Sequence, residues 1–195
     1  RVLFRSSVAQ LLRNVSSVLS SSVGKKPLTI AFDIDPAMPA TLVGDAMRLQ
    51  QVLINLGGNA IKFTAAGKVV VQMRVDHVQG HRYTVRFAVI DSGVGISQQQ
   101  HTQTFDDFNQ GEAAFTRQYG GTGLGLTISK RLVHLMGGKL AVISDVDKGS
   151  TFHFTVSLDA SNDDGLLDST GWQSKTMPPS QKSPVEQQTR ALTGK

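Results

Sequence analysis

The sequence predicts an α+β domain, an α/β sandwich in which about three helices cover one face of a mixed, largely antiparallel sheet. Three segments carry apolar residues at helical spacing. The segments that alternate like strands mostly follow one another directly instead of alternating one by one with helices, which disfavours a doubly wound parallel sheet. The chain has 195 residues, of which 39% are hydrophobic, enough for one core.

Three helices are predicted, and each has a recognisable start or stop. The first follows a short extended segment within residues 1–24 and ends before Pro27. The second spans residues 45–63, with Asp45 as its N-cap. The third spans residues 123–136 and ends at the pair Gly137 and Gly138, a common C-terminal stop.

Five strands are predicted between and after these helices, at residues 28–34, 68–78, 81–91, 139–144 and 150–157. The second and third flank a Gln79-Gly80 turn and are expected to form a hairpin.

The remaining stretches have loop or linker character. Residues 91–125 show little periodicity, so we expect mostly loop. From Asp159 onward polar residues and proline dominate. We therefore expect a folded domain over 1–158 and a polar linker or disordered tail over 159–195.

Composition excludes several classes of function. The net charge is +5, but the basic residues are scattered, so nucleic-acid binding is not expected. Cysteine is absent and the five histidines are isolated, so neither disulfides nor a zinc site is expected. No run of about 18 apolar residues is present, which predicts no membrane contact. The chain begins with Arg1 instead of Met, so we expect a piece of a longer protein.

Three polar residues on the second helix form a candidate phosphate site. Asn55, Asn59 and Lys62 are spaced i, i+4 and i+7, which places them on one face. An amide oxygen suits Mg²⁺ and a lysine suits phosphate. The alternative is an ordinary solvated face. The pair Gly57 and Gly58 favours function, since two glycines inside a helix suggest a close approach to its backbone.

The segment Asp91-Ser-Gly-Val-Gly-Ile96 follows an apolar strand, so the carboxylate of Asp91 is expected at the rim of the sheet. There it would accept a hydrogen bond from an exocyclic amine such as that of adenine. Gly93 and Gly95 would let the backbone turn and a flat ring approach. A plain Asp-Ser-Gly turn explains the same residues.

A glycine-rich segment, Gly120-Gly-Thr-Gly-Leu-Gly-Leu126, leads into the third helix. Backbone N–H groups at a helix start bind anions, and the hydroxyl of Thr122 adds a donor. The glycines do not have the Rossmann spacing and do not follow a strand. In the preceding loop, Phe105 and Phe108 are expected to anchor a lid, and Arg117 either reaches a γ-phosphate or is an exposed surface charge.

These four motifs, in this order, resemble those of the histidine-kinase branch of the GHKL ATPases (gyrase, chaperone, histidine kinase, mismatch repair). Residues 55–64 resemble the N box, 91–95 the G1 box, 105–108 the F box and 121–125 the G2 box. The closing Lys148-Gly-Ser-Thr-Phe152 resembles the family's last strand. The resemblance covers roughly residues 2–158 and implies a Bergerat-type ATP-binding fold with ATP and Mg²⁺ as cofactors.

The resemblance also implies a role for each matching residue. Asn59 would ligate Mg²⁺, Lys62 would contact phosphate, and Asp91 would bind the adenine amine. Asn55 would lie near the phosphates or help to position the acceptor, and Arg117 would assist the transfer. The remaining expected nucleotide-binding residues are Gly93, Gly95, Ile96, Phe108, Gly121, Thr122, Gly123, Leu124 and Gly125.

Position 55 separates the branches of this family. The branches that hydrolyse ATP carry a glutamate four residues before the Mg²⁺ asparagine, as a base for water, whereas this chain has Asn55. An amide cannot take a proton at neutral pH, so we expect transfer of the γ-phosphoryl group to a histidine, which is itself the nucleophile.

The acceptor-histidine motif of the family is absent from the sequence, so this fragment should not phosphorylate itself. The expected partners are a dimerisation and histidine-phosphotransfer domain of the same kinase and a downstream receiver domain. The fragment itself is expected to be monomeric and to belong to the cytoplasmic portion of a bacterial inner-membrane sensor kinase. A degenerate regulatory nucleotide-binding module, and a serine kinase or anti-sigma factor of the same superfamily, are the alternatives.

Overall fold

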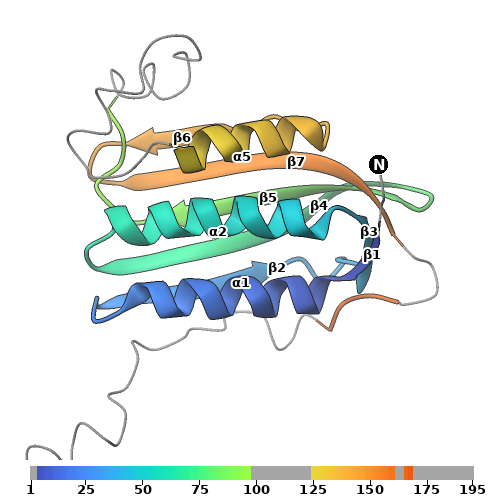
Figure 1. Cartoon of the computed structure of the whole chain (residues 1–195), viewed down its shortest axis with the longest axis horizontal. Helices are drawn as coiled ribbons and strands as arrows, with labels where there is room; N and C mark the ends of the chain where they lie inside the picture. The colour runs from blue at the N-terminus through green and yellow to red at the C-terminus, as the bar shows by residue number, and fades with distance from the viewer. Residues whose placement is uncertain (1–3, 98–123, 161–164, 169–195) are drawn as a thin grey trace, which may run out of the picture.

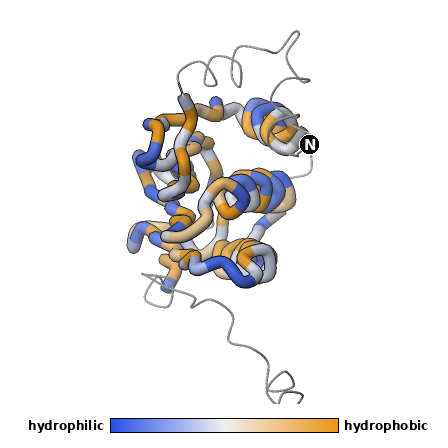
Figure 2. The backbone as a smooth tube through the Cα atoms, turned by 90° about the vertical axis from the view of Figure 1, so that its left-hand side faces the viewer, coloured by the Kyte–Doolittle hydropathy of each residue, from blue (hydrophilic) through white to orange (hydrophobic). Residues whose placement is uncertain are grey.

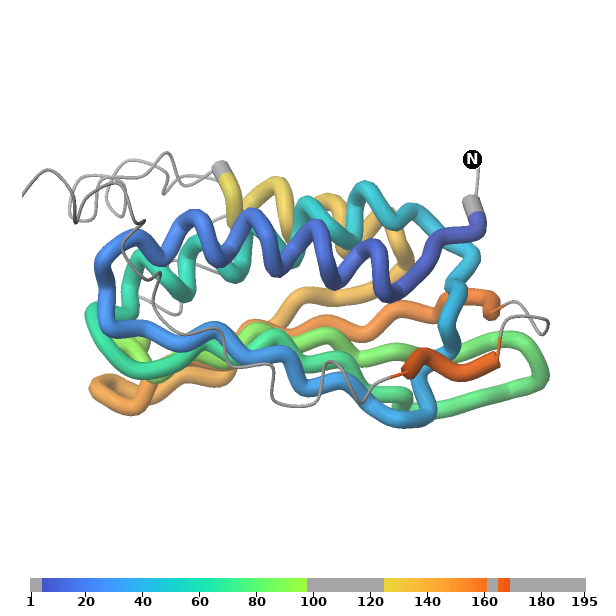
Figure 3. Tube along the Cα trace, turned by 90° about the horizontal axis from the view of Figure 1, so that it is seen from below, coloured from blue at the N-terminus to red at the C-terminus, as the bar shows by residue number. Residues whose placement is uncertain are grey.

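The computed structural model describes residues 4–97, 124–160 and 165–168. This part contains a seven-stranded sheet and three helices, α1 (Val8–Val23), α2 (Ala46–Phe63) and α5 (Leu124–Leu135). All three helices lie side by side on one face of the sheet (Figure 1; Figure 3). The predicted sandwich is therefore confirmed.

The sheet is mixed, as predicted, and its one parallel pair joins β2 to β4. Its order is β1-β3-β7-β5-β4-β2, and β6 also pairs with β7. The other pairs are antiparallel. The strands are β1 (Phe4–Ser7), β2 (Leu28–Ile34), β3 (Thr41–Gly44), β4 (Gly67–Gln79), β5 (Arg82–Asp91), β6 (Ala141–Asp145) and β7 (Gly149–Ala160). The four-residue β3 was not predicted.

Side-chain caps fix where α1 and α2 begin. The hydroxyl of Ser7 accepts a hydrogen bond from the backbone N–H of Gln10 at 3.3 Å. The carboxylate of Asp45 accepts one from the N–H of Arg48 at 3.1 Å and pairs with its guanidinium at 2.9 Å. Each cap satisfies a donor that the first turn leaves unpaired. The predicted N-cap is therefore confirmed.

The core fills the space between the helices and the sheet. Alternate residues of β2 are buried, because successive side chains of a strand point to opposite faces. Phe87 of β5 and Phe154 of β7 stack with ring centroids 5.1 Å apart. Figure 2 shows hydrophobic and hydrophilic residues interspersed along the helices and the strands. In the described part of the chain, no helix is long and apolar enough to cross a membrane.

The chain beyond the predicted last strand contributes to the folded part. β7 continues to Ala160, whereas its predicted end is residue 157. The described residues 165–168 then contact the loop between β2 and β3. The N–H of Ala40 donates to the carbonyl of Gly165 at 3.0 Å, and the N–H of Leu167 donates to the carbonyl of Met38 at 2.7 Å. Leu167 is only 8% exposed and joins the core, so residues 165–168 pack against the domain.

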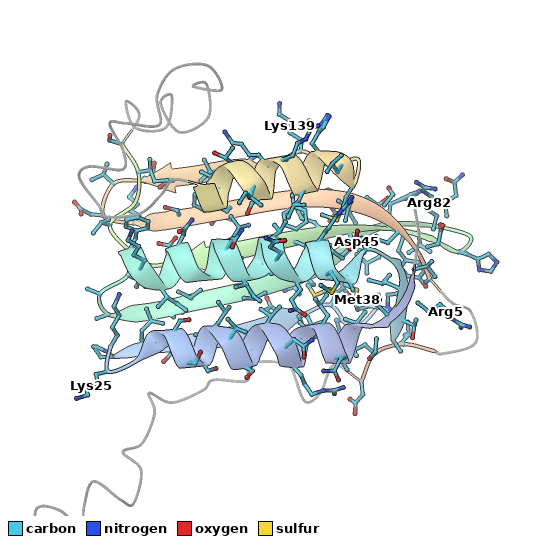
Figure 4. The ribbon with its side chains drawn as sticks, viewed as in Figure 1. Arg5, Lys25, Met38, Asp45, Arg82 and Lys139 are labelled. Carbon is cyan, nitrogen blue, oxygen red and sulfur yellow. The ribbon has the colours of Figure 1, made fainter. Side chains whose placement is uncertain are left out.

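The start of α1 and residues 165–168 lie at the same end of the domain (Figure 1; Figure 3). Figure 4 labels the buried Met38 at this end. The N–H of Val8 donates to the carbonyl of Ala40 at 3.0 Å. Ala40 therefore bonds on one side to the start of α1 and on the other to Gly165.

Candidate functional site

The polar face predicted on α2 is present. The opposite side of the helix is buried, and it comprises Leu49, Val52, Leu53, Leu56, Gly57, Ala60 and Ile61. Asn55 and Asn59 are half-buried and Lys62 is exposed. The helix therefore presents two amides and an ammonium along one line, clear of the core.

Asn55 links α2 to the beginning of α5. Its side-chain N–H₂ donates to the carbonyl of Gly125 at 3.3 Å and lies 3.4 Å from the hydroxyl of Ser129, to which it also donates. The Ser129 hydroxyl donates to the same carbonyl at 2.8 Å. The structure thus joins the motif of residues 55–64 to the helix that follows the glycine-rich motif.

Within the described part of the chain, Asn59 and Lys62 keep their polar groups available. The Lys62 ammonium lies 5.3 Å from the centre of the Phe63 ring, a cation–π contact that is weak at an exposed site. No hydrogen bond joins the Asn59 side chain to another described residue. The free amide oxygen of Asn59 suits Mg²⁺, which prefers hard oxygen ligands. The free ammonium of Lys62 suits phosphate.

The two glycines of α2 have different explanations. A Cβ on Gly57 would lie 2.6 Å from a side-chain carbon of Leu19 in α1, whereas nothing lies within 4 Å of a Cβ on Gly58. The close approach inferred from these glycines is therefore confirmed at Gly57 only. It is helix–helix packing and gives no support for a ligand.

Asp91 is the last residue of β5 and is only 7% exposed. Its Oδ1 accepts a hydrogen bond from the N–H of Gly93 at 2.9 Å. Burial raises the pKa of this carboxyl above its ordinary value, and the backbone N–H groups of Gly93 and Ser150 partly oppose the change. The local turn considered from the sequence is present, and it holds a carboxylate that has no cationic partner among the described residues.

The glycines after Asp91 are required by the protein's own packing. A Cβ on Gly93 would lie 2.5 Å from the carbonyl oxygen of Phe63, at the end of α2. Gly95 has φ +69°, and its Cβ would lie 2.0 Å from the carbonyl oxygen of Asp145. The N–H of Ile96 donates to the Ser144 hydroxyl at 2.8 Å. Residues 92–96 therefore lie between α2 and the β6–β7 turn.

Two further residues support the site, Lys26 and Gly149, and neither was among the predicted site residues. The Lys26 ammonium donates to the carbonyl of Ile61 at 2.6 Å and to that of Thr64 at 3.3 Å, so it caps the C-terminus of α2. Gly149 has φ +92°, and a Cβ there would lie 1.9 Å from the carbonyl oxygen of Asp91. A glycine directly before a predicted strand is a signal for such a position. The lysine has no comparable sequence signal.

Part of the predicted site lies outside the described residues: Phe105, Phe108, Arg117, Gly121, Thr122 and Gly123. Leu124 begins α5. Within the described ranges, no group of three or more His, Cys, Asp or Glu residues is placed to hold a metal ion.

Comparison with known families matches residues 44–160 to the model described as histidine kinase-, DNA gyrase B- and HSP90-like ATPase. The chain is 38% identical over 150 residues to hybrid signal transduction histidine kinase B of Dictyostelium discoideum. It is 36% identical over 148 residues to the signal transduction histidine-protein kinase BarA of Escherichia coli. These alignments cover 77% and 76% of this chain but only 8% and 16% of the relatives.

Solved structures agree with the sequence matches. The full-length structure of ShkA in complex with AMPPNP has a TM-score of 0.66 and 33% identity, over 82% of this chain and 32% of that one. The catalytic domain of the histidine kinase ThkA has a TM-score of 0.61 and 25% identity, over 80% of this chain and 95% of that one.

The chain therefore belongs to the family of histidine kinase-, DNA gyrase B- and HSP90-like ATPases. Within this family it is an ATP-binding catalytic domain of the kind found in sensor and hybrid histidine kinases.

Proposed function

We propose that this domain binds Mg-ATP and supplies the γ-phosphoryl group to a histidine on a separate dimerisation domain of the same kinase. The observation that carries the proposal is the buried carboxylate of Asp91, which ends β5 and has only backbone donors among the described residues. A buried carboxyl with a raised pKa and no cationic partner is typical of a ligand site. In this family fold, the ligand is a nucleotide.

Each described residue has a defined task in this proposal. The ionised Asp91 accepts a hydrogen bond from the exocyclic amine of adenine, because a carboxylate only accepts. The oxygen of Asn59 is the Mg²⁺ ligand, and the bound ion would neutralise phosphate charge. Lys62 contacts phosphate oxygens as a point charge. Phosphoryl transfer requires mainly positioning and electrostatic stabilisation, which these groups provide without covalent chemistry.

Asn55 favours transfer over hydrolysis. Its amide cannot act as a base for water, and its N–H₂ group is already bonded to the start of α5. We propose that the nucleophile is a histidine of another domain. We propose that Arg117 and the glycine-rich residues 121–123 complete the site around the γ-phosphate.

The partners follow from the relatives, which are hybrid and sensor histidine kinases. We propose a dimerisation and histidine-phosphotransfer domain of the same protein as the acceptor. The polar sequence after the domain would connect to a receiver domain. We further propose that the isolated domain is a monomer and works in the cytoplasm, where ATP is supplied.

Titration calorimetry with Mg-ATP tests the nucleotide site. The native domain should bind with a micromolar-to-millimolar Kd, about −4 to −8 kcal/mol, and Asp91→Asn should abolish measurable binding. Asp76→Asn is the matched control, because Asp76 is exposed and pairs with Arg86, five residues before Asp91 on β5. Absence of binding to folded native protein would refute the proposal and favour a regulatory module.

Phosphorylation of a separately supplied dimerisation domain tests the transfer step. The product should be acid-labile, as expected for phosphohistidine, and should depend on Mg²⁺. An acid-stable product would favour the serine-kinase alternative.

A further inference from the structure

Thr64, the first residue after α2, contains a buried polar atom with no partner in the described part of the chain. The residue is 0% exposed, and its hydroxyl oxygen makes no hydrogen bond to a described residue. Its backbone carbonyl is satisfied by the ammonium of Lys26 at 3.3 Å. An unsatisfied buried hydroxyl costs free energy and is rare in native proteins, so this one requires an explanation.

The surroundings of the hydroxyl point to Asp91. An ideal Cβ built on Gly93 would lie 2.9 Å from the Thr64 hydroxyl oxygen and also 2.9 Å from Oδ1 of Asp91. The two oxygens therefore border the same point beside Gly93, where a side chain would clash with both of them. A hydroxyl can donate to a carboxylate, whereas an ionised carboxylate can only accept.

We propose that Thr64 is a positioning residue for Asp91: when nucleotide binds, its hydroxyl donates to the Asp91 carboxylate beside Gly93, where both oxygens border the same point. Thr64 is fully enclosed, so it acts through Asp91 and does not itself contact the nucleotide. The inference rests on the proposed function, in which Asp91 accepts from the adenine amine. Together with the N–H of Gly93, the hydroxyl would fix the plane of the carboxylate and leave a lone pair directed at the amine.

The electrostatic effect has a definite sign. Burial disfavours the ionised form of Asp91, and that form is the one that binds an amine. A hydroxyl that donates to the carboxylate favours ionisation. In the nucleotide-bound protein, removing it should therefore raise the pKa of Asp91, so that nucleotide affinity is lost at a higher pH during acidification. The groups that influence this carboxyl are the backbone N–H groups of Gly93 and Ser150, and no charged side chain of the described residues contributes.

The test uses two substitutions at one position. Thr64→Val has nearly the same shape but lacks the hydroxyl, and Thr64→Ser keeps the hydroxyl. For Thr64→Val we expect a five- to tenfold higher Kd for Mg-ADP, about 1 to 1.4 kcal/mol. We also expect an upward shift of the pH at which binding is lost. The thermal midpoint of Thr64→Val should be unchanged or higher, because an unpaired polar atom is removed from the interior.

Thr64→Ser should bind Mg-ADP like the native protein and with the native pH midpoint. Equal affinity and an equal pH midpoint for Thr64→Val and native protein would overturn the inference and leave the proposed function intact. A parallel loss of affinity and thermal stability in both variants would also overturn it, since it would show a purely structural role. If the native domain did not bind Mg-ADP at all, the proposed function itself would fail.

Discussion

Residues 165–168 should contribute to stability through one side chain. Leu167 is 8% exposed and belongs to the core, whereas its neighbour Leu166 is 60% exposed. Replacing a buried leucine by alanine costs about 2–5 kcal/mol, and less where the site can collapse. Leu167 lies at the edge of the core, near the end of the described chain, so we expect the lower part of this range, about 2–3 kcal/mol for Leu167→Ala.

Urea denaturation and thermal melting measure this effect. For a chain of this length each kcal/mol corresponds to about 2–4 °C, so the thermal midpoint of Leu167→Ala should fall by about 4–12 °C. Leu166→Ala is the matched control, and its unfolding free energy should change by less than about 0.5 kcal/mol. Equal stability of the two variants would show that the segment does not dock in solution and would refute this account of its packing.

Three other perturbations have expected outcomes. Lys26→Met removes the donor that caps α2 and should lower the free energy of unfolding by about 1 kcal/mol, as measured by urea denaturation. Gly149→Ala combines φ +92° with a backbone clash and should cost about 3 kcal/mol or more. Gly80→Ala is the control, because Gly80 has φ +59° but lies in open space, and it should cost only about 1 kcal/mol. Equal losses of stability in the two variants would contradict the clash at Gly149. A hydrogen bond from Arg74 lowers the pKa of Asp33. The contribution of the ionised Asp33 to the stability of the fold is therefore present above about pH 4 and is lost as the pH falls further. Asp33→Asn should remove this part of the pH dependence of the unfolding free energy. An unchanged pH profile of the unfolding free energy would refute the role of Asp33.

The sequence predicted the elements whose signals are local. The three helices have apolar periodicity and recognisable ends, and the hairpin of β4 and β5 has a turn between two alternating runs. Strand β3 escaped prediction because it has only four residues, Thr41–Gly44, too few to show a period. The parallel pairing of β2 with β4 joins strands separated by α2, and no local pattern specifies it.

In the candidate site, too, the features with a local signal could be predicted and those that depend on tertiary contacts could not. Helical spacing correctly placed Asn55, Asn59 and Lys62 on one face, because that geometry depends only on the helix. The contact between Asn55 and Gly125 spans 70 positions and could not be derived from spacing. The purpose of Gly57 was also hidden, since it depends on Leu19 in another helix. Sequence motifs located the polar groups, but tertiary packing decided which of them are free for a ligand.

The bond from Asn55 to α5 changes what a substitution at this position would show. Asn55→Glu places the residue of the hydrolysing branches here, and from the sequence alone it should introduce a base for water. In the structure, however, the Asn55 amide donates to the carbonyl of Gly125 and the hydroxyl of Ser129. A carboxylate has no proton to donate and would face a carbonyl oxygen. We therefore expect Asn55→Glu to lose about 1–3 kcal/mol of stability without a faster hydrolysis of ATP.

Gln50→Glu is the matched control for this amide-to-acid change on the same helix. The side-chain oxygen of Gln50 accepts from Asn14 at 2.9 Å, and a carboxylate preserves an acceptor there. Its free energy of unfolding should stay close to that of the native domain. Urea denaturation and a phosphate-release assay on the three proteins decide the matter. If Asn55→Glu were as stable as the native domain and hydrolysed ATP faster, the helix link would be dispensable, and the identity of residue 55 alone would set the choice between transfer and hydrolysis.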